Sequence, residues 1–201
     1  MPYKPHENLL EYLDIPVNTD RVCPVLDLAC GTGRNGLELA GRNIPVVFAD
    51  RSAAALAEVE QHLSKGKLPG RVWLVDLEQT DVNPFDGQSF SAIICFRYLH
   101  RPLLPDLLNA VEPGGLVIYE TFTTGNRRFG RPNNPDFLLE PGELKTWFQN
   151  WEILHYYEGI QHSPDREIAQ IVTRKHLARC PRPGTPRATG HPDPASAGVH
   201  R

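Results

Sequence analysis

The 201-residue sequence has few cysteines, and their spacing argues against the common cysteine-based sites. No two of them form a CxxC pair, and none lies with histidines at zinc-ligand spacing, so we expect no metal site. Widely separated thiols of this kind are typical of packed side chains in a reducing compartment. The four are Cys23, Cys30, Cys95 and Cys180.

Long hydrophobic runs and an excess of positive charge are also absent. The longest apolar stretches have the length of a strand, and residues 1–11 lack the apolar core of a signal peptide, so we expect a cytoplasmic protein without membrane contact. A formal net charge of −3 disfavours broad nucleic-acid binding, although it allows recognition of one small anionic molecule. The remaining composition, 40% hydrophobic and 22% charged, is that of an ordinary globular domain.

Strand-like and helix-like segments alternate along the middle of the chain. This alternation predicts a parallel sheet with helices on both faces. Ser52 is the expected N-cap of the second helix. The expected strands are 25–29, 45–49, 71–75, 91–96 and 115–121, and the expected helices are 34–42, 52–64, 103–111 and 142–149.

The alternation stops near the end of the chain. Two further strand-like segments, 151–157 and 168–173, are separated by only about ten residues, too few for a crossover helix with its loops. We therefore expect them to pair antiparallel, whereas a plain dehydrogenase domain would continue with another parallel unit.

We expect one domain over residues 1–178 and a tail over 179–201. Residues 1–20 would form an N-terminal helix, at 6–13, and a cap. The tail is rich in proline, glycine and alanine, so almost nothing there could be buried to offset the entropy of ordering, and we predict that it is disordered.

A glycine motif follows the first expected strand. Gly31, Gly33 and Gly36 satisfy GxGxxG, and together with the preceding apolar run they predict a strand, a tight turn and a helix whose N-terminus a ligand can approach. Asp27 lies four residues before Gly31, and its carboxylate would repel a pyrophosphate but attract a cationic ligand. The motif is therefore weak support for a dinucleotide site.

Aspartates are also expected at the ends of the first three strands. Asp27, Asp50 and Asp76 would lie on the rim where an open parallel sheet binds its ligand. Asp50 follows Gly33 at nearly the spacing of an acidic residue that accepts hydrogen bonds from ribose hydroxyls. The alternative is that Asp50 only caps the helix that begins near Ser52, and that Asp76 only starts a solvated turn.

Residues 25 to about 175 resemble the class I S-adenosylmethionine (SAM)-dependent methyltransferases, of the small bacterial type related to the tellurite-resistance (TehB-like) enzymes. The resemblance rests on the run from Asp27 to Asn35, on Asp50, on the Pro-Gly-Gly turn at 113–115 and on the terminal hairpin. It implies an α/β, Rossmann-like, seven-stranded methyltransferase sheet that is mostly parallel, with a C-terminal antiparallel hairpin and helices on both faces. It also implies SAM as the cofactor.

By this resemblance, Arg51 would lie against the adenine, and Asp76 with Leu77 would meet the adenine edge. Asp27 would act near the methionine ammonium through water or backbone groups, and Cys30 would be a packing residue rather than a nucleophile. The resemblance implies these cofactor-binding residues: Asp27, Ala29, Cys30, Gly31, Gly33, Asn35, Asp50, Arg51, Asp76, Leu77 and Phe96.

Catalytic candidates follow the fourth expected strand, in the run Tyr98, His100 and Arg101. The Asn/Asp-Pro-Pro-aromatic motif, which relatives that methylate amino nitrogens often have here, is absent, and this disfavours nucleobase amino methylation. His100 could act as a general base or as a donor to an anion. Alternatively, His100 and Arg101 only cap the helix that begins near Leu103.

Acceptor-binding candidates follow the fifth expected strand. Tyr119 and Glu120 lie near the end of this strand, and a long loop follows it to about residue 141. Arg127, Arg128 and Arg131 in this loop could clamp a carboxylate, phosphate or other oxyanion, because loops of this length are commonly lids or binding loops. Otherwise these arginines only keep an exposed loop soluble.

We therefore predict an enzyme that transfers the SAM methyl group to a small, anionic acceptor by in-line displacement at an oxygen, sulfur or other chalcogen nucleophile. Two alternatives stay open. One is an RNA or protein methyltransferase whose arginine loop meets the polymer, and the other is a catalytically silent SAM-binding subunit that regulates a partner.

Overall fold

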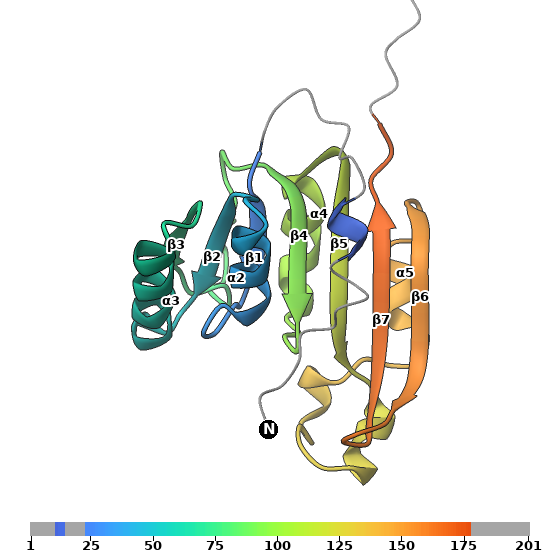
Figure 1. Cartoon of the computed structure of the whole chain (residues 1–201). Coiled ribbons are helices and arrows are strands. Elements are labelled where there is room, and N and C mark those ends of the chain that lie inside the picture. Colours follow the sequence, from blue (N-terminus) through green and yellow to red (C-terminus); the bar gives the residue numbers. More distant parts are fainter. Residues whose placement is uncertain (1–10, 15–22, 178–201) are drawn as a thin grey trace, which may run out of the picture.

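A computed structural model describes residues 11–14 and 23–177. Seven strands form one sheet in the order β3-β2-β1-β4-β5-β7-β6 (Figure 1). The strands are β1 (Val25–Leu28), β2 (Val46–Asp50), β3 (Gly70–Leu74), β4 (Phe90–Phe96), β5 (Val111–Phe122), β6 (Glu152–Gln161) and β7 (Arg166–Arg174). The α-helices are α2 (Arg34–Gly41), α3 (Ala53–Gly66), α4 (Leu104–Ala110) and α5 (Glu143–Trp147). The short 3₁₀ helices are η1 (Glu11–Asp14), η2 (Arg101–Leu103), η3 (Thr124–Arg128) and η4 (Pro135–Phe137).

The sheet has the mixed topology that the sequence predicts. The first five strands pair in parallel, whereas β7 is antiparallel to both β5 and β6. The terminal hairpin is tighter than expected, because its strands extend to Gln161 and from Arg166 and leave only four residues between them. The predicted antiparallel end of the sheet is confirmed.

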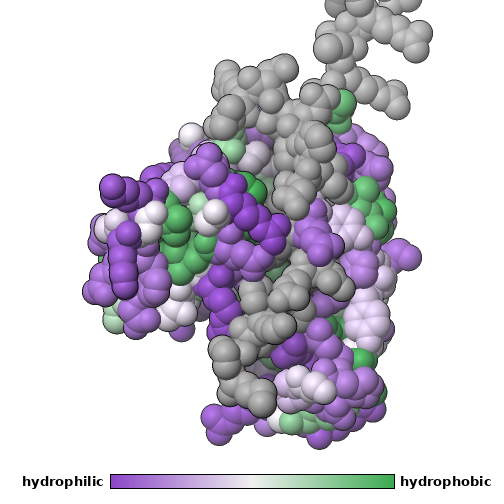
Figure 2. All heavy atoms as spheres, in the orientation of Figure 1, coloured by the Kyte–Doolittle hydropathy of each residue, from purple (hydrophilic) through white to green (hydrophobic). Residues whose placement is uncertain are grey.

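Helices cover both faces of the sheet, and each face has its own apolar cluster. On one face, α2 and α3 pack Leu39, Leu56 and Val59 against strand residues such as Phe48. On the other face, leucines of α4 and α5, together with Phe148 just after α5, belong to a larger cluster. The residues of the two clusters are buried, and the face of the molecule drawn in Figure 2 is largely hydrophilic among the described residues.

Helix boundaries follow the local sequence signals. Ser52 is the N-cap of α3, as predicted, and its hydroxyl accepts a hydrogen bond from the Ala55 amide at 3.2 Å. The helix expected at 103–111 is observed as α4, with η2 directly before it, and Pro102 and Pro105 lie in the first turns of η2 and α4, where proline is tolerated. Most of the helix expected at 6–13, and the tail expected at 179–201, lie outside the described residues.

Candidate functional site

The loop between β1 and α2 exposes backbone at the carboxyl edge of the sheet. Ala29, Gly31 and Gly33 all have positive φ, at 53°, 55° and 72°. A Cβ placed on Gly31 would meet nothing within 4 Å, so open space lies beside this residue. The loop therefore leaves its backbone accessible to a ligand at the start of α2.

The other two glycines serve packing. A Cβ on Gly33 would lie 2.7 Å from Val59 Cγ2, and a Cβ on Gly36 would lie 2.6 Å from Asp27 Oδ2 and overlap the Phe48 ring. These contacts allow α2 to approach the sheet and α3 closely. The three glycines of the motif thus have two roles: access at Gly31 and close packing at Gly33 and Gly36.

Asp27 lies below this loop rather than on the rim where the sequence placed it. Its side chain is only 3% exposed, because Asp27 is the third of four residues in β1 and not its last. Its Oδ2 accepts a hydrogen bond from the Gly36 amide at 2.9 Å. Burial raises the pKa of Asp27 to about 7, the Gly36 hydrogen bond opposes this rise, and the Asp50 charge adds to it.

Asp50 connects the glycine loop to the start of α3. Its Oδ2 accepts a hydrogen bond from the Gly31 amide at 2.7 Å, and its Oδ1 accepts one from the Ser52 amide at 2.8 Å. The hydrogen bond from the Ser52 amide agrees with the alternative that Asp50 caps the start of α3. The carboxylate also lines a cavity, so the helix contact does not exclude a second role in ligand binding.

This first cavity has a volume of about 220 Å³ and lies beyond the carboxyl ends of β1, β2 and β3. Asp76 Oδ1 accepts a hydrogen bond from the Glu78 amide at 3.0 Å, and Arg51 lies 3.5 Å from the Glu78 carboxylate. Six of the nine lining residues are among the cofactor-binding or catalytic candidates of the sequence analysis, and Val75, Glu78 and Arg97 are not. The whole lining is Ala29, Asp50, Arg51, Val75, Asp76, Leu77, Glu78, Arg97 and Tyr98.

Two polar atoms near this edge of the sheet are buried without a hydrogen-bond partner among the described residues. They are Asn35 Oδ1, in the first turn of α2, and the Tyr98 hydroxyl oxygen. A buried polar atom without a partner is costly, so such atoms commonly face a ligand or water. Together with three lining carboxylates and the open backbone at Gly31, they fit a nucleoside cofactor that carries positive charge.

Cys30 has the properties of a packing residue. Burial raises the pKa of its thiol, and the nearby carboxylates Asp27 and Asp50 raise it further. The thiol donates to the Gly31 carbonyl, with a sulfur–oxygen distance of 3.4 Å. A protonated thiol is a poor nucleophile, and this agrees with the role that the resemblance implies.

The three catalytic candidates after β4 point to different surroundings. Tyr98 lines the first cavity, and its carbonyl accepts a hydrogen bond from the Tyr119 hydroxyl at 2.8 Å. His100 precedes η2, makes no side-chain cap, and lines two other cavities near α4. Of the three, only Tyr98 is therefore placed beside the candidate cofactor site.

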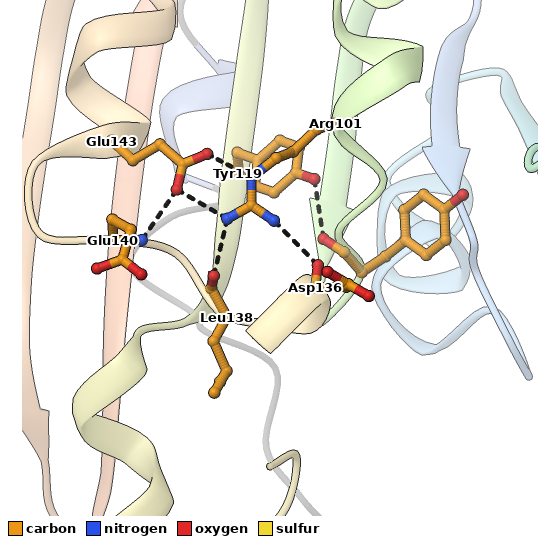
Figure 3. Close-up of polar contacts among 7 residues, drawn as sticks. Arg101, Tyr119, Asp136, Leu138, Glu140 and Glu143 are labelled. Atoms are coloured by element: carbon orange, nitrogen blue, oxygen red, sulfur yellow. Dashed lines mark hydrogen bonds and ion pairs between the residues drawn. The ribbon is translucent and has the colours of Figure 1, made fainter. Parts of the chain in front are cut away.

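Arg101 is bound within the protein. Figure 3 shows its guanidinium between Glu143 and two carbonyls that precede α5. Nε lies 2.7 Å from Glu143 Oε1, and the two terminal nitrogens donate to the Asp136 and Leu138 carbonyls at 3.1 and 2.8 Å. The Glu143 carboxylate raises the pKa of Arg101 above its ordinary value. Arg101 therefore ties η2 to the segment that precedes α5.

The strap, residues 123–142, leaves β5 at the carboxyl edge of the sheet and is the yellow segment of Figure 1. It carries the three arginines that the sequence analysis offered as an anion clamp. Arg128 pairs with Glu167 of β7, and its guanidinium lies 4.8 Å from the Phe129 ring centroid. Arg127 and Arg131 are exposed and line none of the described cavities.

Three further candidates lie in β4 and β5 and are held by the sheet. Tyr119 and Glu120 are both buried, and the Glu120 Oε2 accepts a hydrogen bond from Gln170 Nε2 at 2.6 Å. Phe96 packs against the cluster beneath α2 and α3 and does not line the first cavity. These residues therefore pack within the sheet and do not line the first cavity.

Within the described residues, no group of three or more histidine, cysteine or acidic side chains is arranged to hold a metal ion. None of the helices in the described ranges has the length and apolarity needed to cross a membrane.

Comparisons with known proteins agree with this geometry. Residues 25–115 match the family described as "Methyltransferase domain". The chain is 27% identical over 156 residues to "Probable S-adenosyl-L-methionine-dependent methyltransferase TehB" of Haemophilus influenzae (strain 10810), covering 74% of this chain and 54% of the relative. It is 32% identical over 162 residues to "Demethylmenaquinone methyltransferase" of Clavibacter sepedonicus, covering 76% and 62%.

A third relative, "Hemagglutinin 1" of Eikenella corrodens, is 28% identical over 175 residues, covering 84% of this chain and 57% of the relative. Among solved structures, that of TehB from Haemophilus influenzae superposes with a TM-score of 0.68 at 22% identity, covering 85% of this chain and 62% of the other. The chain spans little more than half the length of these relatives. The structural likeness confirms the predicted fold.

Proposed function

We propose that this chain, which belongs to the TehB-like class I SAM-dependent methyltransferases, binds SAM in the first cavity and transfers its methyl group to a small anionic acceptor. The observation that carries the proposal is the position of Asp50. It ends β2, holds the Gly31 amide and lines the cavity at the same time.

The lining residues have roles that follow from their chemistry. The Asp50 carboxylate would accept hydrogen bonds from the ribose hydroxyls, and Asp76 with Leu77 would contact the adenine. The Gly31 backbone and the unpartnered Asn35 Oδ1 would face the methionine part. The carboxylates outnumber the guanidinium groups in this lining, so it favours a cation over a pyrophosphate.

When bound, SAM supplies a methyl group on a sulfonium: the acceptor lone pair forms a bond to this carbon, the sulfur–carbon electron pair returns to sulfur, and any acceptor proton passes to solvent. The protein then mainly has to align the acceptor and exclude water, and alignment alone can contribute roughly 7–11 kcal/mol. Tyr98 suits this role. Burial raises the pKa of its phenol, so the hydroxyl stays protonated at neutral pH and can donate to an acceptor oxygen.

Titration calorimetry of the full chain with SAM and with NADH tests the cofactor. We expect binding of SAM and of S-adenosylhomocysteine, and none of NADH. Asp50→Asn should weaken SAM binding by about tenfold or more, because charge-assisted hydrogen bonds contribute roughly 1.5–3 kcal/mol each. Asp86→Asn, in an exposed loop before β4, is the matched control and should bind normally. Binding of NADH without SAM would contradict the proposal.

Isotope-labelled SAM tests the transfer itself. The protein is incubated with labelled SAM and a cell extract, and small molecules are then separated from polymers. Label in a small anionic product supports the proposed acceptor class. Label in RNA or protein overturns that class while leaving methyl transfer intact, and label that stays on SAM with every substrate pool overturns the enzymatic function.

A further inference from the structure

A second cavity, of about 330 Å³, adjoins the first. The two cavities share four lining residues, Arg51, Glu78, Arg97 and Tyr98. Tyr98 therefore stands between them, and its buried hydroxyl oxygen has no partner among the described residues. A molecule in the second cavity would lie directly beside a molecule in the first.

The charge balance changes sign between the two cavities. The first is lined by Asp50, Asp76 and Glu78 together with two arginines. In the second, Glu78 is the one carboxylate in the lining, and the same two arginines, Arg51 and Arg97, remain. The first cavity thus favours a cation and the second an anion.

The rest of the second cavity is apolar and partly aromatic. Phe122 ends β5, Pro132 and Phe137 come from the strap, and Leu99 follows β4. Phe137 is 48% exposed, an unusual position for a large aromatic side chain. The Arg97 guanidinium lies 5.9 Å from the Phe122 ring centroid, so charge and aromatic surface occupy one wall.

Contacts at both ends hold this wall in place. At the start of the strap, the Glu167 carboxylate binds Arg128 and accepts from Thr123 Oγ1 at 2.9 Å. Near its end, Arg101 binds Glu143 and the carbonyls of Asp136 and Leu138. The segment that carries Pro132 and Phe137 is therefore anchored from β7 and from η2.

We propose that the second cavity is the acceptor subsite, and that the acceptor is an amphipathic organic anion with a flat apolar body between Phe122 and Phe137 and an acidic group facing Arg97. The inference rests on the proposed function and narrows its acceptor. A bare inorganic oxyanion would contact Arg97 but leave the aromatic wall without a contact. Tyr98 donates a hydrogen bond to the acceptor at the boundary between the cavities.

Calorimetric binding of 2-naphthoate to the full chain, saturated with S-adenosylhomocysteine, tests this inference. Its uncharged analogue 2-naphthamide and the small anion acetate serve as comparison probes. We expect 2-naphthoate to bind at least about tenfold more tightly than either, because only it contacts both the guanidinium through a charge and the apolar wall through a ring.

Two variants separate the contributions. Phe137→Ala should weaken 2-naphthoate binding by about tenfold, whereas Phe129→Ala, on the same strap but outside the cavity lining, should not weaken it. Arg97→Gln should reduce the preference for 2-naphthoate over 2-naphthamide to about one. An unchanged midpoint of urea unfolding confirms in each case that the variant is folded, and Phe137→Ala should also keep its affinity for S-adenosylhomocysteine, because Phe137 does not line the first cavity.

Several outcomes overturn the inference. The first is equal affinity for acetate and 2-naphthoate. The second is an equal loss of 2-naphthoate affinity in Phe137→Ala and Phe129→Ala. The third is that Arg127→Gln abolishes the preference for 2-naphthoate over 2-naphthamide while Arg97→Gln keeps it. In all of these the cofactor still binds, so the proposed function survives. If S-adenosylhomocysteine itself fails to bind the unaltered chain, the proposed function fails first, and the acceptor inference falls with it.

Discussion

Asp27 is the buried group whose protonation a cationic cofactor should change. Burial raises its pKa to about 7, so at pH 6.0 about 90% of chains carry this proton. An opposite charge nearby lowers a carboxyl pKa by roughly 1–3 units. With a two-unit drop, SAM binding at pH 6.0 should release about 0.8 proton per chain, and SAM affinity should fall about eightfold between pH 7.5 and pH 6.0.

Calorimetry in two buffers of different ionisation enthalpy measures this proton release. At pH 6.0 the SAM amino group is already protonated, so the released proton belongs to the protein. Asp27→Asn should abolish the release and flatten the pH dependence of affinity, since asparagine still offers an oxygen to the Gly36 amide. Asp86→Asn should behave like the unaltered chain. Zero proton release, or equal release from Asp27→Asn, would refute the reasoning.

The same shift has a consequence for stability in the absence of ligand. The folded pKa of Asp27 lies above its unfolded value of 3.8, so between these values the folded state binds more protons than the unfolded state. The contribution of Asp27 to the unfolding free energy therefore falls as pH rises from about 4 to 7, by up to about 4 kcal/mol. The difference between the unaltered chain and Asp27→Asn in urea unfolding isolates this contribution.

Two further predictions concern packing and the strap. In urea titration, Gly36→Ala should lower the unfolding free energy by about 2–3 kcal/mol, because the added methyl group meets the Asp27 carboxylate. Gly41→Ala is the control: nothing lies within 4 Å of its Cβ, so this variant should be neutral or slightly stabilising. Arg101→Gln and Glu143→Gln should show a coupling of about 1 kcal/mol in a double-mutant cycle and faster proteolysis of the strap. If the losses of unfolding free energy in the two single variants simply add in the double variant, the ion pair does not stabilise the strap.

Local sequence signals were sufficient for the sheet and for much of the first cavity. The glycine motif, the Ser52 cap and the short gap before the last strand are each set by neighbouring residues. Asp50 could be placed because the residue that ends a parallel strand must lie at the carboxyl edge. Asp27 was placed less well, since β1 ends one residue beyond it and its side chain turns under the loop.

The direction of long side chains could not be predicted, because distant partners decide it. Arg128 is held by Glu167, 39 residues away, and Arg101 by Glu143, 42 residues away. The sequence could not show that Arg128, one of the three arginines offered as a clamp, pairs with Glu167 and anchors the loop. Arg97 was missed for a related reason: its φ of 60° turns the chain after β4, and no glycine or asparagine marks this turn.

This turn explains how one tyrosine can stand between two cavities. The Arg97 amide donates to the Glu120 carbonyl at 2.7 Å, and the Tyr119 hydroxyl holds the Tyr98 carbonyl, so β5 fixes the position of Tyr98. The cofactor side of the site is therefore built on the sheet, whereas the outer acceptor wall comes from the strap. Substitutions at Pro132 or Phe137 can then change which acceptor is accepted while cofactor binding stays intact, because neither residue lines the first cavity.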